Sequence, residues 1–168
     1  MSEADGQAIS DSAIFAKKSY QWYVLILLTI VYVFNFIDRN ILGILGQSIK
    51  DELGISDTAF GFLGGIAFAI FYTFMGIPIA RLADRKSRKT ILSVCLVIWS
   101  AMTAMCGFVQ NFVHLVLFRI GVAVGEAGGS PPSHSMISDL FPEERRGTAL
   151  GVYALGIPLG SAIGFLAG

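Results

Sequence analysis

Five apolar runs of membrane length predict that the chain is an all-α polytopic membrane protein. The sequence has 168 residues, of which 54% are hydrophobic and 14% are charged, whereas a soluble domain is nearer a quarter charged. Its mean hydropathy is +0.68. Because the apolar residues come in uninterrupted runs, membrane-spanning helices explain this composition better than a deeply buried soluble core. The basic residues form no patch with interleaved aromatics, which argues against nucleic-acid binding.

The apolar runs divide the chain into a tail and a transmembrane part. Residues 1–19 are polar and lack the basic and apolar regions of a cleavable signal, so we expect a disordered cytoplasmic tail. The transmembrane part covers residues 20–168. Its predicted spans are about 22–44, 58–80, 90–109, 112–136 and 147–168. The last run is followed by no polar tail, which predicts that the chain is truncated, an N-terminal fragment of a longer protein.

Local signals support each span in turn. Trp22 and Tyr23 suit the headgroup layer where the first span begins, and residues 45–57 are expected to form a polar loop. The second span is uncharged and contains Pro78 among several glycines, which fits close packing and a bend. A polar turn at Gln110–Asn111 separates the third span from the fourth, and the fifth carries regularly spaced glycines.

The placement of Lys and Arg predicts the orientation. With the amino terminus inside, nine of the twelve basic residues lie in cytoplasmic segments and only Lys50 lies in an outer loop. The positive-inside rule therefore predicts a multi-pass protein of the cell membrane whose N-terminus is cytoplasmic.

Four charged residues inside the predicted spans form the candidate site. Asp38 and Arg39 lie in the first span, and Arg119 and Glu126 lie in the fourth. A charge in hydrocarbon costs at least ~2.5 kcal/mol, so such groups usually face a bundle interior and mark ion or substrate pathways. Helix geometry puts Asp38 and Arg119 at the same depth, so we expect them to pair, with Glu126 deeper and without a cation at its own depth.

The residue types suggest two roles at this site. Glu126 and Asp38 are predicted to couple transport to protons, since a carboxyl in an apolar interior can bind and release a proton near neutral pH. Arg119, Arg39 and Asn35 are assigned to a substrate cavity, where the arginines favour an anionic group. The alternative is that the charges form a static network that only fixes helix packing.

Other reactive residues support no enzyme. Cys95 and Cys106 have no partner cluster and are expected to be free thiols. Ser133-His134-Ser135 has no carboxylate fixed beside it and no nucleophile elbow. Pro131 and Pro132 bend the fourth span, either for packing or to shape the site. We expect no catalytic group, no metal site and no cofactor.

The loop after the second span resembles a known family. Residues Ala80-Arg-Leu-Ala-Asp-Arg-Lys-Ser-Arg-Lys89 are similar to the Gly-x-Leu-Ala-Asp-Arg-x-Gly-Arg-Arg signature of the major facilitator superfamily, with Ala80 and Ser87 in place of two glycines. The resemblance implies the first five transmembrane helices of a major-facilitator-type N-terminal six-helix half. It also implies that Asp84, Arg85 and Arg88 form a gating latch against the missing C-terminal half.

Two further motifs resemble spinster-type transporters, here bacterial ones: Phe36-Ile-Asp38-Arg39, and Arg119 with Gly125-Glu126-Ala127. The resemblance implies a secondary, proton-coupled, alternating-access carrier of a small organic solute, anionic or lipid-like. Its implied partners are the lipid bilayer, the small-molecule solute, protons and the missing half of the same chain. The alternatives are an organic anion/cation symporter, which shares the Arg…Glu-Ala pattern, and a non-transporting membrane sensor on the same fold.

Overall fold

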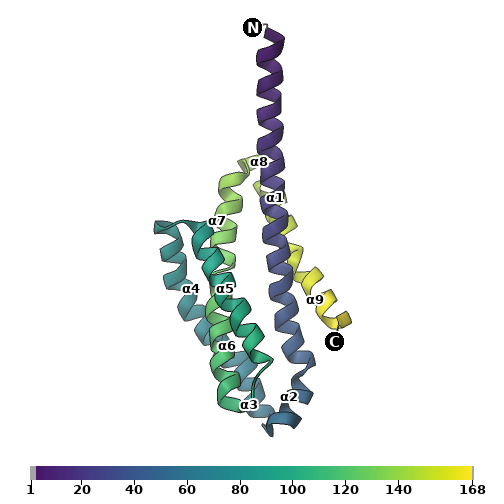
Figure 1. Ribbon diagram of the computed structural model, residues 1–168, viewed down its shortest axis with the longest axis vertical. Coiled ribbons are helices and arrows are strands. Elements are labelled where there is room, and N and C mark those ends of the chain that lie inside the picture. Colours follow the sequence, from purple (N-terminus) through teal and green to yellow (C-terminus); the bar gives the residue numbers. More distant parts are fainter. Residues whose placement is uncertain (1–2, 168) are drawn as a thin grey trace.

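The computed structural model describes residues 3–167, and every regular element in that range is a helix (Figure 1). The elements are α1 (Glu3–Ile44), α2 (Gly46–Leu53), α3 (Asp57–Gly61), the π-helix η1 (Phe62–Ala67), α4 (Phe68–Arg85), α5 (Arg88–Cys106), α6 (Phe112–Ala127), α7 (Ser130–Leu140), α8 (Glu143–Ala154) and α9 (Gly156–Ala167). The fold class predicted from the sequence is confirmed.

Five helical segments are long and apolar enough to cross a membrane, which matches the number and order of the predicted spans. They are Lys17–Ile44, Asp57–Arg85, Arg88–Cys106, Phe112–Leu140 and Glu143–Ala167. Many large apolar side chains, such as Phe74 and Val97, lie exposed on the outside of the bundle. Such an apolar surface suits contact with lipid. The backbone of these segments can also lie in lipid, because helices satisfy their own backbone hydrogen bonds.

Two segments differ from the expectation. Residues 3–19 belong to α1 rather than to a disordered tail, and this part of α1 extends beyond the other helices (Figure 1). Adding residues to an existing helix is far easier than nucleating one, and the segment contains no proline. The predicted polar loop 45–57 contains the helix α2, which ends at Gly54 in the left-handed conformation (φ 64°).

Polar side chains define where the spans begin. Ser87 caps α5, and its hydroxyl accepts a hydrogen bond from the backbone N–H of Thr90. Asn111 caps α6 by accepting from the N–H of His114 at 2.9 Å. The fourth span is broken between α6 and α7, where Pro131 lies in the first turn of α7. Proline is tolerated at that position because the N–H it lacks has no intrahelical partner there.

Close helix contacts bring the site residues together. A Cβ atom on Gly125 of α6 would lie 2.6 Å from the backbone nitrogen of Trp99 in α5. A Cβ atom on Gly160 of α9 would lie 2.7 Å from Cβ of Phe36 in α1. Only glycine therefore allows these backbones to approach so closely. The first contact fixes α6, which carries Arg119 and Glu126, and the second fixes α1, which carries Asp38 and Arg39.

Candidate functional site

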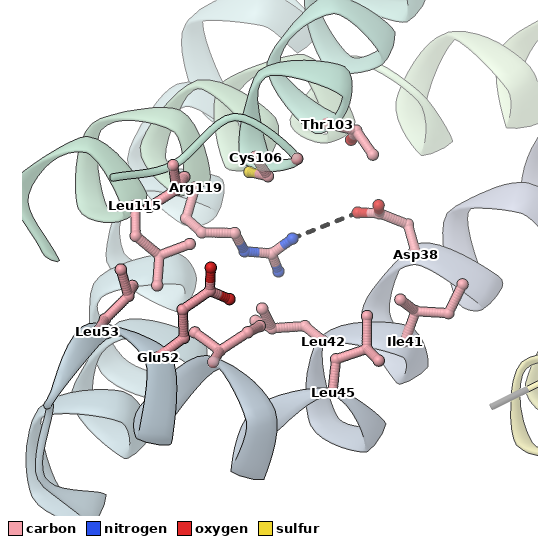
Figure 2. Close-up of a pocket in the computed structure, with 13 residues that line it drawn as sticks. Asp38, Ile41, Leu42, Leu45, Glu52, Leu53, Thr103, Cys106, Leu115 and Arg119 are labelled. Atoms are coloured by element: carbon pink, nitrogen blue, oxygen red, sulfur yellow. Dashed lines mark hydrogen bonds and ion pairs between the residues drawn. The ribbon is translucent and has the colours of Figure 1, made fainter. Parts of the chain in front are cut away.

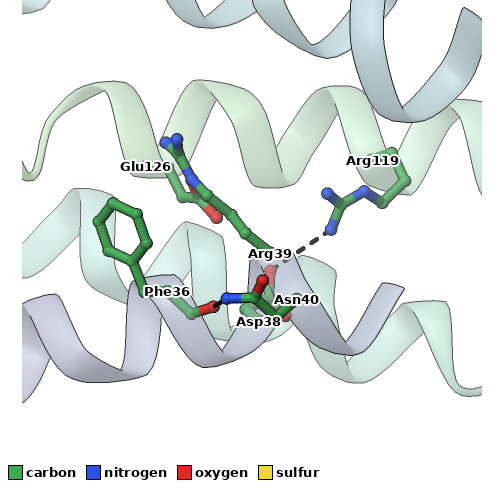
Figure 3. Close-up of polar contacts among 6 residues, drawn as sticks. All are labelled: Phe36, Asp38, Arg39, Asn40, Arg119 and Glu126. Atoms are coloured by element: carbon green, nitrogen blue, oxygen red, sulfur yellow. Dashed lines mark hydrogen bonds and ion pairs between the residues drawn. The ribbon is translucent and has the colours of Figure 1, made fainter. Parts of the chain in front are cut away.

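Two ion pairs join α1 to α6 inside the bundle (Figure 3). Asp38 accepts from Arg119, with Oδ2 and Nη1 3.3 Å apart. Arg39, the next residue along α1, contacts Glu126, with Nη2 and Oε2 2.8 Å apart. Neighbouring residues of α1 thus pair with residues two turns apart on α6, and each helix contributes one acid and one base.

The first pair agrees with the sequence prediction, and the second corrects it. The pairing of Asp38 with Arg119 follows from their similar depth. The expectation that Glu126 has no cationic neighbour is wrong, because Arg39 reaches it from α1. The predicted depth of each charge follows the position of its Cα atom. The long side chain of arginine can place its charge more than a turn away from that atom.

The carboxyl of Glu126 is the most buried charge of the site. Its side chain is 0% exposed, and Oε1 has no hydrogen-bond partner among the described residues. A small cavity of about 20 Å³ lies beside it, lined also by Asn35, Tyr32 and Tyr153. A cavity of this volume has room for one water molecule. The arrangement provides a carboxylate with one oxygen held by a cation and the other free to accept a proton.

Aromatic rings surround the two arginines. The guanidinium carbon of Arg39 lies 5.6, 5.2 and 5.1 Å from the ring centroids of Phe36, Phe68 and Tyr72. The same Phe68 ring lies 5.2 Å from the guanidinium carbon of Arg119. These distances are within the range of cation–π attraction. Phe68 therefore links the two ion pairs.

No sequence pattern indicated that Phe68 and Tyr72 belong to the site. They lie four residues apart in an uncharged apolar span, where aromatic residues are ordinary, so only their shared helical face could have indicated a common role. The π-helix η1 ends directly before Phe68. Such insertions are frequent at functional sites and change which side chains face a neighbouring helix.

A second, larger cavity reaches the Asp38–Arg119 pair from the end of the bundle formed by α2 (Figure 2). Its volume is about 260 Å³, and its lining includes Glu52, Thr103 and Cys106. Figure 2 shows Glu52 and Arg119 on the same side of this cavity. Nε of Arg119 and Oγ1 of Thr103 have no hydrogen-bond partner among the described residues. No sequence pattern indicated a role for Glu52, which lies in the segment expected to be a loop.

The proposed latch residues lie at the opposite end of the bundle. Arg88 forms an ion pair with Asp139 at the end of α7, within the same half. Asp84 and Arg85 are exposed, and neither forms an ion pair with another described residue. Arg88 thus differs from the other two in having a partner, Asp139, that no sequence pattern indicated.

Asn35 lies half-buried in α1, one turn before Asp38 and Arg39. It shares the small cavity with Glu126. All five residues assigned from the sequence to proton coupling and to the cavity therefore gather between α1 and α6, whereas the three latch residues do not belong to this group.

Comparison with known proteins gives the chain a family context. The family described as Major Facilitator Superfamily matches residues 28–168. The chain is 40% identical over 147 residues to an MFS-type efflux pump of Mycolicibacterium smegmatis, covering 88% of this chain and 34% of the relative. It is 34% identical to a probable L-galactonate transporter of Escherichia coli, covering 87% and 32%. It is 36% identical to the sphingosine-1-phosphate transporter SPNS2 of Mus musculus, covering 84% and 26%.

Solved structures give the same context. The chain is similar to the crystal structure of a bacterial homolog to the human lysosomal transporter spinster, in an inward-facing and unoccupied conformation. The sequence identity is 46% and the TM-score is 0.83, over 86% of this chain and 30% of that one. The chain therefore spans about a third of the length of the relatives that it matches.

Proposed function

The chain belongs to the major facilitator superfamily, and on this premise we propose that it is part of a proton-coupled secondary transporter for a small organic solute. The solute carries an anionic group, as in an organic acid or a lipid-like phosphate ester. Transport proceeds by alternating access between two halves of the bundle. The protein lies in the cell membrane with its N-terminus in the cytoplasm.

One observation carries the proposal: the buried contact between Arg39 and Glu126, 2.8 Å long. The side chain of Arg39 is 33% exposed, whereas that of Glu126 is 0% exposed. A solute anion can therefore approach the guanidinium from the accessible side. Protonation of Glu126 removes the competing negative charge, so proton binding and anion binding favour each other. By linkage, each ligand raises the affinity for the other by the same factor.

The other residues assist this exchange. Asp38 balances the positive charge of Arg119 while Arg39 exchanges Glu126 for the solute anion. Asp38 also provides a second carboxyl for proton coupling. Asn35 offers an amide beside the free oxygen of Glu126. Phe68 contacts both guanidinium groups, so a movement of one arginine shifts the ring that contacts the other.

The names of the relatives support an anionic solute. A galactonate and a sphingosine phosphate each carry an anionic group, although one is a sugar acid and the other a lipid. Arginine suits both, because its planar guanidinium binds carboxylate and phosphate in the same bidentate manner. An organic anion/cation symporter is the second candidate, and the match to the probable L-galactonate transporter favours it. The two candidates differ in the apolar part of the solute.

At the other end of the bundle, Asp84, Arg85 and Arg88 form the gating latch. Arg88 is anchored to Asp139 in this half, which leaves Asp84 and Arg85 exposed to meet the second half of the transporter.

The test is uptake into proteoliposomes by a polypeptide of the relatives' full length that contains this chain. A pH gradient should drive accumulation of labelled galactonate or sphingosine-1-phosphate, and E126Q should abolish it. E144Q, which changes an exposed carboxylate outside the ion pairs and outside the linings of both cavities, serves as the matched control and should retain uptake. Full proton-driven accumulation by E126Q would overturn the proposed coupling.

A further inference from the structure

A groove with a volume of about 940 Å³ lies between the start of the first span and the connection from α7 to α8. It is at the end of the bundle opposite α2 and is separate from the ion pairs of α1 and α6 (Figure 1). Four of the residues that line it are basic: Lys17, Lys18, Arg145 and Arg146.

The basic residues of the groove outnumber its two acids, Asp139 and Glu143. None of its four basic residues forms an ion pair with another described residue. Asp139 also lines the groove, but Arg88 occupies its carboxylate. Glu143 is the other acid of the lining. Nε of Arg146 is buried and has no hydrogen-bond partner among the described residues.

The floor of the groove is aromatic and joins two helices. The rings of Trp22 and Phe141 meet edge to face, with centroids 6.0 Å apart. The side-chain amide of Gln21 donates to the backbone carbonyl of Leu140. Tryptophan at the start of a transmembrane span lies at the level of the lipid headgroups. We therefore expect the groove to lie at the depth of the phosphate groups of the bilayer.

The apolar surface continues from the groove along α1. Tyr23, Ile26 and Leu27 follow Trp22 and are exposed. A ligand with an anionic head and acyl chains would match both parts, its head among the basic residues and its chains along this face. A soluble phosphate would use only the first part.

We propose that this groove is a binding site for the phosphate group of an anionic phospholipid. Basic pockets between helices on the cytoplasmic side are suited to such headgroups, because each Lys or Arg near the surface adds to the attraction. The bound lipid bridges α1 and α8 at the end of the bundle. The site does not depend on the proposed transport activity.

Tryptophan fluorescence can detect the lipid directly. The protein has two tryptophans, and Trp99 is 7% exposed in α5 whereas Trp22 is 39% exposed at the groove. In W99F, reconstituted in mixed bilayers, dibrominated phosphatidylglycerol should quench Trp22 more strongly than dibrominated phosphatidylcholine at equal mole fraction. Equal quenching by the two lipids would overturn the proposal.

Charge variants test whether the basic residues of the groove cause the preference for phosphatidylglycerol. In the W99F background, K17Q/K18Q/R145Q/R146Q should reduce the relative affinity for phosphatidylglycerol by roughly tenfold or more, since four attractive charges are lost. K17Q/K18Q alone should reduce it several-fold. The matched control K86Q/K89Q removes two exposed lysines at the same end but outside the groove, and it should retain the preference.

Three results would contradict the proposal. One is a similar loss in K86Q/K89Q, which would indicate a general effect of net charge. Another is release of the brominated lipid by millimolar glycerol phosphate, which would indicate a site for soluble phosphates. The third is unchanged quenching in K17Q/K18Q, a substitution of exposed residues that is expected to leave folding intact.

Discussion

Arg39 on α1 contacts Glu126 on α6 through two nitrogen atoms, since Nε and Nη2 both lie 2.8 Å from Oε2 of the carboxylate. An intact buried pair adds little net stability, because desolvation offsets the attraction between the charges. Removing one partner is different, since it leaves the other charge buried and uncompensated.

R39Q should therefore lower the free energy of unfolding by about 3–5 kcal/mol. The double variant R39Q/E126Q should recover most of that loss, because no buried charge then lacks a partner. The measurement is the unfolding midpoint of each variant in a graded detergent denaturation. Equal losses in the single and the double variant would show that Arg39 and Glu126 act independently.

The two cysteines should differ in reactivity. Cys106 lines the cavity of about 260 Å³ that leads to Arg119, whereas Cys95 is buried against Gly128 between α5 and α6. A small methanethiosulfonate reagent should label Cys106 at least about tenfold faster, because reaction requires access to the sulfur. The measurement is the labelling rate by mass spectrometry, and C106S should abolish the fast phase. Faster labelling of Cys95 would contradict the described packing.

The sequence predicted those features of the molecule that depend on patterns within a single segment of the chain. The number and order of the spans follow from uninterrupted apolar runs, and the structure confirms the all-α class. The spinster-like resemblance is also confirmed by the relatives and by the similar solved structures. The pairing of Asp38 with Arg119 followed from depth alone, because both residues belong to regular helices whose rise per residue is fixed.

What remained hidden depends on side-chain reach and on contacts between distant segments. No local signal shows that Arg39 turns towards Glu126, since its direction is set by the packing of α1 against α6. In the sequence, nothing distinguishes Phe68 from the other apolar residues of its span. In the structure it follows η1 directly, and its ring contacts both arginines. The partner of Arg88 was also missed, because Asp139 lies 51 residues further along the chain.

The effect of replacing a glycine by alanine on stability should depend on its position in the bundle. G125A places a Cβ atom 2.6 Å from the backbone of Trp99, which cannot move as a flexible side chain can. We expect a loss of about 1–3 kcal/mol from this overpacking. G151A in α8 is the matched control, because its Cβ would meet no atom within 4 Å, and it should be neutral or slightly stabilising. The same denaturation assay distinguishes them, and equal effects would argue against close packing of α5 on α6.

The contact between Arg88 and Asp139 should matter for transport more than for stability. Their side chains are 32% and 64% exposed, and ion pairs on such a surface contribute about 0–1 kcal/mol. D139N should therefore shift the unfolding midpoint only slightly. If the pair positions the latch, the same variant in the full-length transporter should lower the rate of solute uptake several-fold. R88K, which keeps the charge but not the planar guanidinium, should fall between D139N and the unmodified protein. A large loss of stability with normal uptake would assign the pair to packing instead, and normal behaviour in both assays would remove Arg88 from the proposed latch.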